Sequence, residues 1–234
     1  MITQLNDRST RERLLEAARY LFWERGYAAT GIAEILHRAK ANAGSFYHFF
    51  AGKEALLLAV LDSYLEGLEP IIVRPAFASR PDPIDRIFAI LAGYRERLVQ
   101  TGCSYGCPLG RLALEIEAEN LPAHGRIAAN FAGWTGAVRR CLEDARDRLP
   151  RDCDRDGLAT FVLTVMEGGV MQSRTFRRME PFDQSVAQLR NYFACLTRNK
   201  EGNHETATND RHRVRRPAER RIGPGKTGKP GKSK

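Results

Sequence analysis

Long apolar runs are absent from this 234-residue chain. A membrane-spanning helix needs about 18 or more apolar residues, whereas the most apolar window, Phe161 to Met171, is short and contains Glu167. The first twenty residues also lack the apolar stretch and small-residue cleavage site of a secretory signal. We therefore expect no membrane partner and a cytoplasmic location.

Cysteine and histidine are too sparse to indicate a metal site or a catalytic centre. The five cysteines form no CxxC pair, and an odd number in a cytoplasmic chain argues against a disulfide framework. Only Cys103 and Cys107 are close in sequence, and among five histidines only His124 could approach Cys107 as a base. We expect no metal, no cofactor and no catalytic residue, which leaves a cysteine-dependent enzyme as the disfavoured alternative.

The excess of positive charge is confined to the end of the chain. The net charge is +9, but residues 200–234 hold 11 Lys and Arg against four Asp and Glu, a balance of +7 that leaves +2 for residues 1–199. This segment has no apolar periodicity, and we expect a disordered basic tail over 200–234. It either adds sequence-independent DNA affinity through counterion release or is a dispensable solvated extension.

No stretch alternates with period two, so the expected fold class is all-α, with a three-helix head followed by a larger helical body. In the head, Ser9 and Glu12 have the spacing of a capping box, and Gly26 is placed to end the first helix. Short helices are expected over residues 31–38, capped by Thr30, and over residues 43–49, capped by Asn42. The body helices are expected after Gly52 and over residues 82–101, 109–120, 122–149, 156–178 and 183–198, with a break marked by Pro70, Pro75, Pro81 and Pro83.

Two short helices joined by a tight turn and braced by a first helix can read DNA, with the second short helix in the major groove. The small residues Ala43, Gly44 and Ser45 would let its backbone approach the bases closely. Tyr47 and His48 have side chains that suit phosphate contacts. The spacing alone fits equally well a helical bundle without a DNA-binding role, in which Tyr47 is a core aromatic residue.

Three stretches of the head resemble the TetR family of transcriptional regulators, and the match needs no gap from residue 11 to residue 56. They are RERLLEAARYLFWERGY at 11–27, TGIAEI at 30–35 and GSFYHFFAGKEAL at 44–56. The resemblance implies a head that binds DNA and a helical body that dimerises and binds a ligand. By position it implies phosphate contacts from Thr30, Tyr47, His48 and Lys53, and base contacts from Ala43, Gly44 and Ser45.

The turn between the two short helices departs from the family pattern. The family usually has Ala-Gly-Val-Ser, and this chain has Ala39-Lys40-Ala41-Asn42. Without the turn glycine, Lys40 occupies a position that often favours positive φ, which is a modest strain. Lys40 either only carries this strain or also gains a phosphate contact, and the operator sequence does not transfer from the family.

The segment Gly-Cys-Pro-Leu-Gly-Arg-Leu-Ala at 106–113 is similar to the family branch that contains the N-ethylmaleimide-responsive repressor. In that branch the cysteine matching Cys107 responds to electrophiles or oxidants. Pro108 fits the first turn of a helix, whose N-terminus would favour the Cys107 thiolate, and Arg111 would add to this effect, although the family usually has Asn there. Cys103 could act as a resolving partner. The alternative is that Cys107 is a packing residue.

A noncovalent ligand is the other candidate signal. The walls of its pocket would be Phe88, Tyr94, Leu112, Phe131, Trp134, Thr135 and Met166, although aromatic residues at these spacings also fit a plain core. Glu167 interrupts an apolar helix. It either faces a cationic ligand, or pairs with an arginine at a subunit interface, or is solvated.

The last two body helices carry wide apolar stripes, which predict a homodimer built on a four-helix bundle. Gly168 and Gly169 lower helix propensity there, and close helix packing would explain them. A two-fold dimer implies a pseudo-palindromic operator on double-stranded DNA. The predicted protein is a ligand- or redox-responsive regulator, a repressor by resemblance, with a DNA-binding domain over 1–52, a ligand-binding and dimerisation domain over 53–199 and the tail. A constitutive architectural DNA-binding protein is the alternative. Induction distinguishes the two, because a regulator releases its operator when a ligand or oxidant is added and an architectural protein does not.

Overall fold

The computed structural model describes residues 9–211, and the side chains of residues 9–198. No strand occurs in this part of the chain, and none of its helices is long and apolar enough to cross a membrane. The predicted all-α class is confirmed. The helices are α1 (Thr10–Arg25), α2 (Ile32–Ala39), α3 (Ala43–Phe49), α4 (Lys53–Gly67), the π-helix η2 (Leu68–Val73), α5 (Arg74–Ser79), α6 (Pro83–Gln100), α7 (Pro108–Glu115), α8 (Leu121–Asp144), the 3-10 helix η3 (Arg146–Arg148), α9 (Arg155–Phe176) and α10 (Glu180–Arg211).

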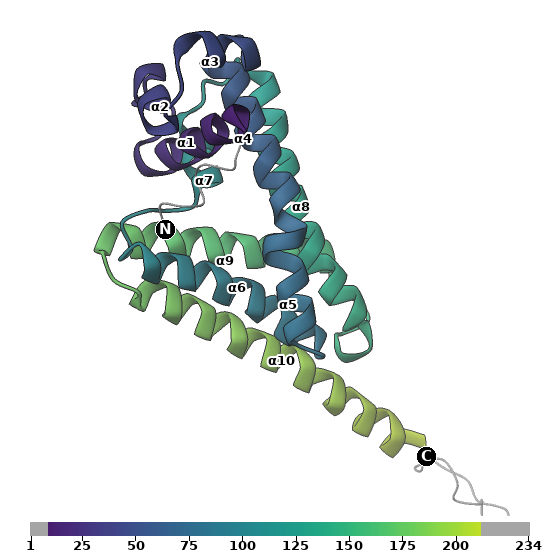
Figure 1. Cartoon of the computed structure of the whole chain (residues 1–234). Helices are drawn as coiled ribbons and strands as arrows, with labels where there is room; N and C mark the ends of the chain where they lie inside the picture. Colours follow the sequence, from purple (N-terminus) through teal and green to yellow (C-terminus); the bar gives the residue numbers. More distant parts are fainter. Residues whose placement is uncertain (1–8, 212–234) are drawn as a thin grey trace, which may run out of the picture.

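The helices form a small head and a larger body, joined by two long helices. Figure 1 shows α1, α2 and α3 gathered at one end, with α6, α9 and α10 at the other. The helices α4 and α8 run side by side from the head into the body, and α7 lies below α1. The head is therefore held to the body by two continuous helices and by α7.

The capping residues of the head follow from its sequence, with one exception. The Ser9 hydroxyl accepts from the Glu12 amide at 3.3 Å, and the Glu12 carboxylate accepts from the Ser9 amide at 2.8 Å, which confirms the capping box. Asn42 caps α3 by accepting from the Ser45 amide at 2.8 Å. The prediction that Thr30 caps the second helix is wrong, because α2 begins one residue later and its N-cap is Gly31.

The core of the head extends beyond the three-helix unit. Phe22 of α1 and Phe46 of α3 are buried together with Leu57 of α4, and Leu112 of α7 and Ile127 of α8 complete the same cluster. The head core thus draws on residues from both sides of the predicted domain boundary at 52/53. A displacement of α4, α7 or α8 has to be accommodated by the head, because cores are close-packed.

The predicted helix break at Pro70 and Pro75 is wrong. The chain passes from α4 through η2 directly into α5, and Pro75 lies in the first turn of α5, where its fixed φ suits a helix. Pro70 lies inside the π-helical segment, where the regular i to i−4 ladder is already interrupted. The break comes later, and Asp82 then caps α6 by accepting from the Ile84 amide at 2.8 Å.

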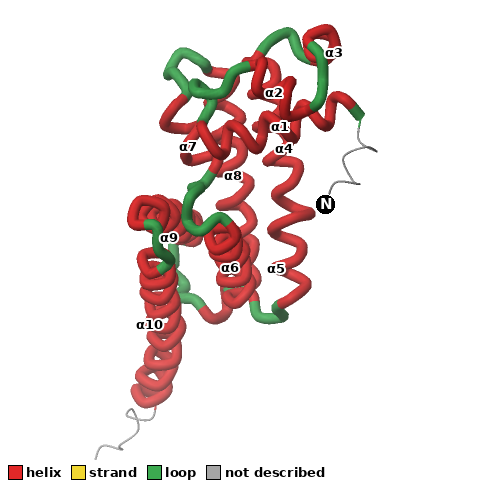
Figure 2. The backbone as a smooth tube through the Cα atoms, turned by 60° about the vertical axis from the view of Figure 1, so that its left-hand side comes forward, coloured by secondary structure: helices red, strands yellow, loops and turns green. Residues whose placement is uncertain are grey.

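The body is closed by α9 and α10. A Cβ on Gly169 of α9 would lie 3.1 Å from Cδ2 and 3.3 Å from Cα of Phe182 on α10, so this glycine allows close packing, whereas a Cβ on Gly168 would meet nothing. Helix α10 continues to Arg211, which corrects the prediction of disorder for residues 200–211. Its far end extends beyond the other helices in both views (Figures 1 and 2). The rest of the predicted tail, residues 212–234, lies outside the described residues.

The two kinds of glycine in these helices give a stability test. We expect Gly169→Ala to lower the free energy of unfolding by about 1–3 kcal/mol, because the added methyl group overpacks the contact with Phe182. Gly136→Ala on α8 is the control, since its Cβ would meet nothing, and it should raise stability by about 0.5–1 kcal/mol through helix propensity. Urea unfolding at one fixed protein concentration measures both, and equal effects of the two substitutions would contradict the packing account.

Candidate nucleic-acid interface and adjoining cavity

The outer face of α3 is small and exposed. Phe46 is fully buried and anchors the helix, while Ala43, Gly44 and His48 are exposed, Ser45 is half-buried and Tyr47 is 59% exposed. Tyr47 packs only edge-on against Phe46 at 5.1 Å between ring centroids, so it is not a core residue. The face can therefore approach another molecule closely along its backbone.

Two lysines flank this face. Lys40 is exposed at the end of α2 in the left-handed conformation, with φ 50, as the missing turn glycine predicts. Lys53 begins α4, and its ammonium lies 4.3 Å from the centroid of the Tyr27 ring, where burial lowers the pKa of Lys53. Both charges lie near helix ends that bracket α3. This arrangement suits contacts with the phosphates on either side of a groove.

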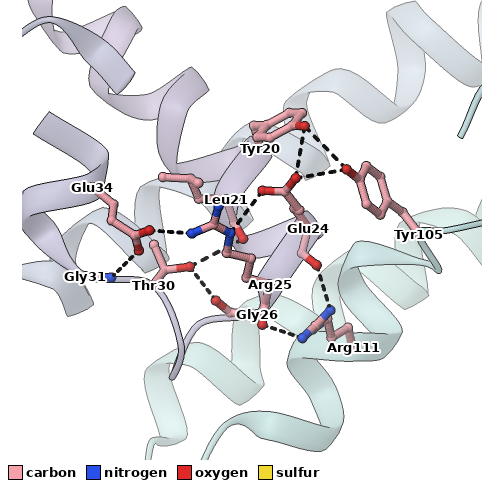
Figure 3. A network of polar contacts seen from close by, with 10 residues as sticks. All are labelled: Tyr20, Leu21, Glu24, Arg25, Gly26, Thr30, Gly31, Glu34, Tyr105 and Arg111. Atoms are coloured by element: carbon pink, nitrogen blue, oxygen red, sulfur yellow. Dashed lines mark hydrogen bonds and ion pairs between the residues drawn. The ribbon is translucent and has the colours of Figure 1, made fainter. Parts of the chain in front are cut away.

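Thr30 does not belong to this surface. Its side chain is 1% exposed, and its hydroxyl donates to the Gly26 carbonyl at 2.6 Å, with the Leu21 carbonyl 3.3 Å away. Figure 3 shows the hydroxyl between these groups. The phosphate contact implied for the Thr30 side chain is therefore not available in this structure, because the hydroxyl is buried and engaged within the head.

The head and α7 are joined by a clamp, which we define as Arg111 and Glu115 of α7 with the groups that they bind. Arg111 donates to the Glu24 carbonyl at 3.2 Å and also to the Arg25 carbonyl, at the end of α1 (Figure 3). The Glu115 carboxylate accepts from the Tyr27 amide at 2.8 Å, just after α1. A cation thus meets the negative end of the α1 dipole, and an anion meets the free amides that follow.

Further contacts link the loop before α7 to α1. Trp23 Nε1 donates to the Gly106 carbonyl at 2.6 Å, and the Tyr105 hydroxyl donates to the Glu24 carboxylate at 3.0 Å. Sequence reasoning missed Trp23, Tyr105 and Glu115. Their partners lie more than 80 residues away along the chain, so no local pattern could have indicated them.

Cys107 is the N-cap of α7, and its Sγ accepts from the Gly110 amide at 3.5 Å. The expectation of a lowered pKa is nevertheless wrong. Burial raises the pKa of the Cys107 thiol well above its ordinary value, and the negative charge of Glu167 raises this pKa further. These effects outweigh the helix N-terminus, and Arg111 gives no help because it binds α1 instead.

Cys103 packs against the loop between α9 and α10. It is buried at a positive φ of 55, and its Sγ lies 3.3 Å from Met179 Sδ. Burial raises the pKa of Cys103. It lines neither of the cavities described next, so the structure does not bring it to the site as a resolving partner of Cys107.

Two adjoining cavities lie between the head and the body, with volumes of about 70 and 250 Å³. Of the predicted wall residues, Tyr94, Phe131, Trp134 and Met166 line the smaller cavity, and the sensor candidate Cys107 lines it with them. The larger one lies against α1, where Trp23 and Tyr105 line it. The two cavities share a wall, and we refer to them together as the head–body cavity. The shared wall residues are Arg19, Tyr64, Tyr94, Arg97, Cys107 and Pro108.

Three predicted wall residues are not in the head–body cavity. Phe88 packs against Phe193 at 5.7 Å between ring centroids, in the core between α6 and α10. Leu112 is buried in the head core, and the Thr135 hydroxyl donates to the Phe131 carbonyl. Phe88 and Leu112 thus pack against other helices, and the Thr135 hydroxyl is bound within α8.

An exposed, small-faced helix on a three-helix head is the arrangement of a helix-turn-helix DNA-binding protein. Family comparison agrees with this class. A family described as bacterial regulatory proteins, TetR family, matches residues 14–60, and a tetracyclin repressor-like C-terminal domain matches residues 83–189. The chain belongs to the TetR family of helix-turn-helix transcriptional regulators, a family of non-enzymatic proteins.

Individual relatives are similar over most of their length. The transcriptional repressor DhaR of Mycobacterium sp. strain GP1 is 26% identical, covering 74% of this chain and 87% of the relative. The repressor NemR of Escherichia coli K12 is 25% identical, covering 80% and 96%. The crystal structure of reduced E. coli NemR has a TM-score of 0.69 at 26% identity, covering 78% and 96%. A TetR regulator of Rhodobacter sphaeroides, at 24% identity and a TM-score of 0.71, covering 76% and 96%, shares the fold.

Two substitutions of Lys40 distinguish the strain of its left-handed backbone from a phosphate contact of its side chain. We expect Lys40→Gly to raise the free energy of unfolding by about 1 kcal/mol, because only glycine adopts this conformation without strain. Lys40→Ala keeps the strain and should give no gain. If Lys40 contacts a phosphate, both variants should reduce the salt slope of operator binding by about one. Urea unfolding and binding titrations at several salt concentrations measure these outcomes, and an unchanged salt slope would remove the phosphate contact.

The clamp gives a second stability prediction. Arg111→Ala should lower the free energy of unfolding by about 1–3 kcal/mol, because the partly buried Glu24 carbonyl and the exposed Arg25 carbonyl at the end of α1 lose their donor. The control is Arg139→Ala, which breaks an ion pair with Asp156 in which both side chains are more than half exposed. It should change stability by less than about 1 kcal/mol. Equal losses from the two variants in urea unfolding would mean that the clamp does not hold the head.

Proposed function

We propose that this protein is a repressor that binds a pseudo-palindromic operator as a dimer and leaves it when a small molecule occupies the head–body cavity. One observation carries the proposal: a single short helix, α7, starts in the cavity wall at Cys107 and holds the end of α1 with Arg111 and Glu115. A ligand that moves the start of α7 therefore acts on the DNA-reading head. Such a ligand changes operator affinity by binding the two arrangements of α7 unequally.

The proposed DNA contacts follow the exposed face of the head. Ala43, Gly44 and Ser45 would face the bases, while Tyr47, His48, Lys40 and Lys53 would contact phosphates. Their exposure and their position around α3 support these roles. Thr30 would act through packing alone, since its hydroxyl is bound within the head.

The proposed homodimer would cover an apolar surface on α9 and α10. Phe161 and Tyr192 are nearly half exposed and pack edge-on at 5.7 Å, and Met171 is 61% exposed. A shallow hollow between the two helices reaches Gly168, whose missing side chain leaves room for a partner helix. Large exposed apolar patches of this kind are typical of protein interfaces. A monomer at micromolar concentration in size measurements would contradict this proposal.

A noncovalent ligand is the signal that we favour over modification of Cys107. The raised pKa keeps the thiol protonated near neutral pH, and a protonated thiol is a poor nucleophile. Oxidation or alkylation of Cys107 is the second candidate, because this residue lies in the cavity wall and because the similar E. coli repressor was solved in a reduced form.

The two signals are distinguished by thiol reactivity. At neutral pH we expect N-ethylmaleimide to modify the exposed Cys195 before Cys107, as measured by mass mapping of peptides over time. The operator is first selected from genomic fragments, and its release is followed by fluorescence anisotropy. Cys107→Ser should leave any release caused by quinones or aldehydes unchanged. Preferential labelling of Cys107, together with loss of that release in Cys107→Ser, would contradict the noncovalent signal and establish the second candidate.

A further inference from the structure

The carboxylate of Glu167 is a buried acceptor built into the wall of the smaller cavity. Its Oε1 is buried and has no hydrogen-bond partner, and no arginine or lysine of the described chain forms an ion pair with it. Burial raises the pKa of this carboxylate, and a hydrogen bond from the Cys107 thiol partly offsets that effect. A Cβ on Gly110 would lie 2.5 Å from Oε2, so glycine at this position makes room for it. A buried acceptor without a hydrogen-bond partner is costly, so a donor on a bound molecule would stabilise it.

The opposite charge lies on the wall that the two cavities share. Arg19 of α1 and Arg97 of α6 line both cavities, and neither forms an ion pair with a described residue. The Nε of Arg19 is buried without an acceptor, while its guanidinium hydrogen-bonds the side chain of Tyr64 and lies 5.0 Å from the centroid of that ring. Glu16, an exposed residue on the larger cavity, is the other acid in these walls. The cavity thus offers two cations along its shared wall.

The charges are separated along the cavity. Glu167 and Trp134 line only the smaller part, whereas the arginines continue into the larger part, which Trp23 lines. Tyr64 and Tyr94 line both parts, so an aromatic wall connects the two charged regions. The indole Nε1 of Trp134 is a further buried donor, and its polar neighbour is the Tyr94 hydroxyl. A purely cationic molecule would meet the arginines, and a purely anionic one would leave Glu167 unpaired.

We infer that the effector is a small dipolar acid with a ring: its acidic group pairs with Arg19 and Arg97, and a hydrogen-bond donor at its other end, such as an amine, reaches Glu167. This assignment names the ligand class of the site in the proposed function and rests on it. Unpaired buried groups are costly, and a ligand that satisfies them is selected against analogues that lack either group. The ring of the ligand packs against Tyr64 and Tyr94, between the arginines and Glu167.

Three probes of nearly the same shape test the charge pattern on the free, full-length protein. They are 4-(aminomethyl)benzoate, which carries both groups, 4-methylbenzoate, which has only the acid, and 4-methylbenzylamine, which has only the amine. Calorimetry measures affinity, and intrinsic fluorescence reports occupancy, because the only two tryptophans of the chain, Trp23 and Trp134, line the cavity. We expect the dipolar probe to bind at least about tenfold more tightly than either of the others.

Variants then place each group of the probe. Glu167→Gln should abolish the preference for the dipolar probe over 4-methylbenzoate. Arg97→Gln should reduce its preference over 4-methylbenzylamine without removing it, because Arg19 still lines both cavities. The controls Glu119→Gln and Arg151→Gln remove exposed charges outside both cavities and should change neither ratio. Circular dichroism checks that all four variants fold, and the ratio of affinities within one variant is independent of its stability.

The outcomes separate this inference from the proposed function. Equal binding of the three probes, tighter binding of the amine alone, or no saturable binding of the dipolar probe up to ~1 mM would overturn the inference, while another ligand could still release the operator. If the dipolar probe binds as expected and the operator complex is unaffected at saturation, the ligand class stands and the proposed function fails.

Discussion

The binding of the end of α1 by α7 is the interaction on which the rest of this structure depends. The last carbonyls of α1 and the amides just after it cannot be satisfied within the helix, and Arg111 and Glu115 supply the missing partners. Gly26 is needed at this point, because a side chain there would collide with the Glu115 carboxylate and because φ is 94. Helix α3, which we propose reads DNA, packs on α1, so the orientation of its exposed face follows from this junction.

The cavity and the clamp meet because α7 is short. Cys107 caps its first turn, Gly110 makes room for Glu167 in the same turn, and Arg111 and Glu115 face the head. Burial and a neighbouring carboxylate raise the pKa of the Cys107 thiol and act against the effect of the helix N-terminus. The cavity wall therefore holds buried polar groups without hydrogen-bond partners. Such groups favour binding of a molecule that supplies the partners, and they do not activate the Cys107 thiol as a nucleophile.

On the proposed DNA-reading surface, packing has the opposite effect, because it leaves side chains exposed. Phe46 fixes α3 in the head core, which frees the residues on its other face from any structural role. Small side chains there keep the surface low, and the charges stand at the neighbouring helix ends. Lys40 keeps a left-handed conformation without glycine, a local strain that the rest of the head sustains.

Local chemistry in the sequence determined the helices, the caps at Ser9 and Asn42, the small face of α3 and the family of the head, because each depends on residues three or four apart or on one continuous segment. Only the tertiary structure decided which groups meet across the chain. It buried Thr30, turned Arg111 from Cys107 to α1 and placed Phe88 in the core. It also carried the helix through Pro70 and left Glu167 without a cation. These outcomes depend on helix rotation and long-range packing, which periodicity restricts to a face but does not assign to a neighbour.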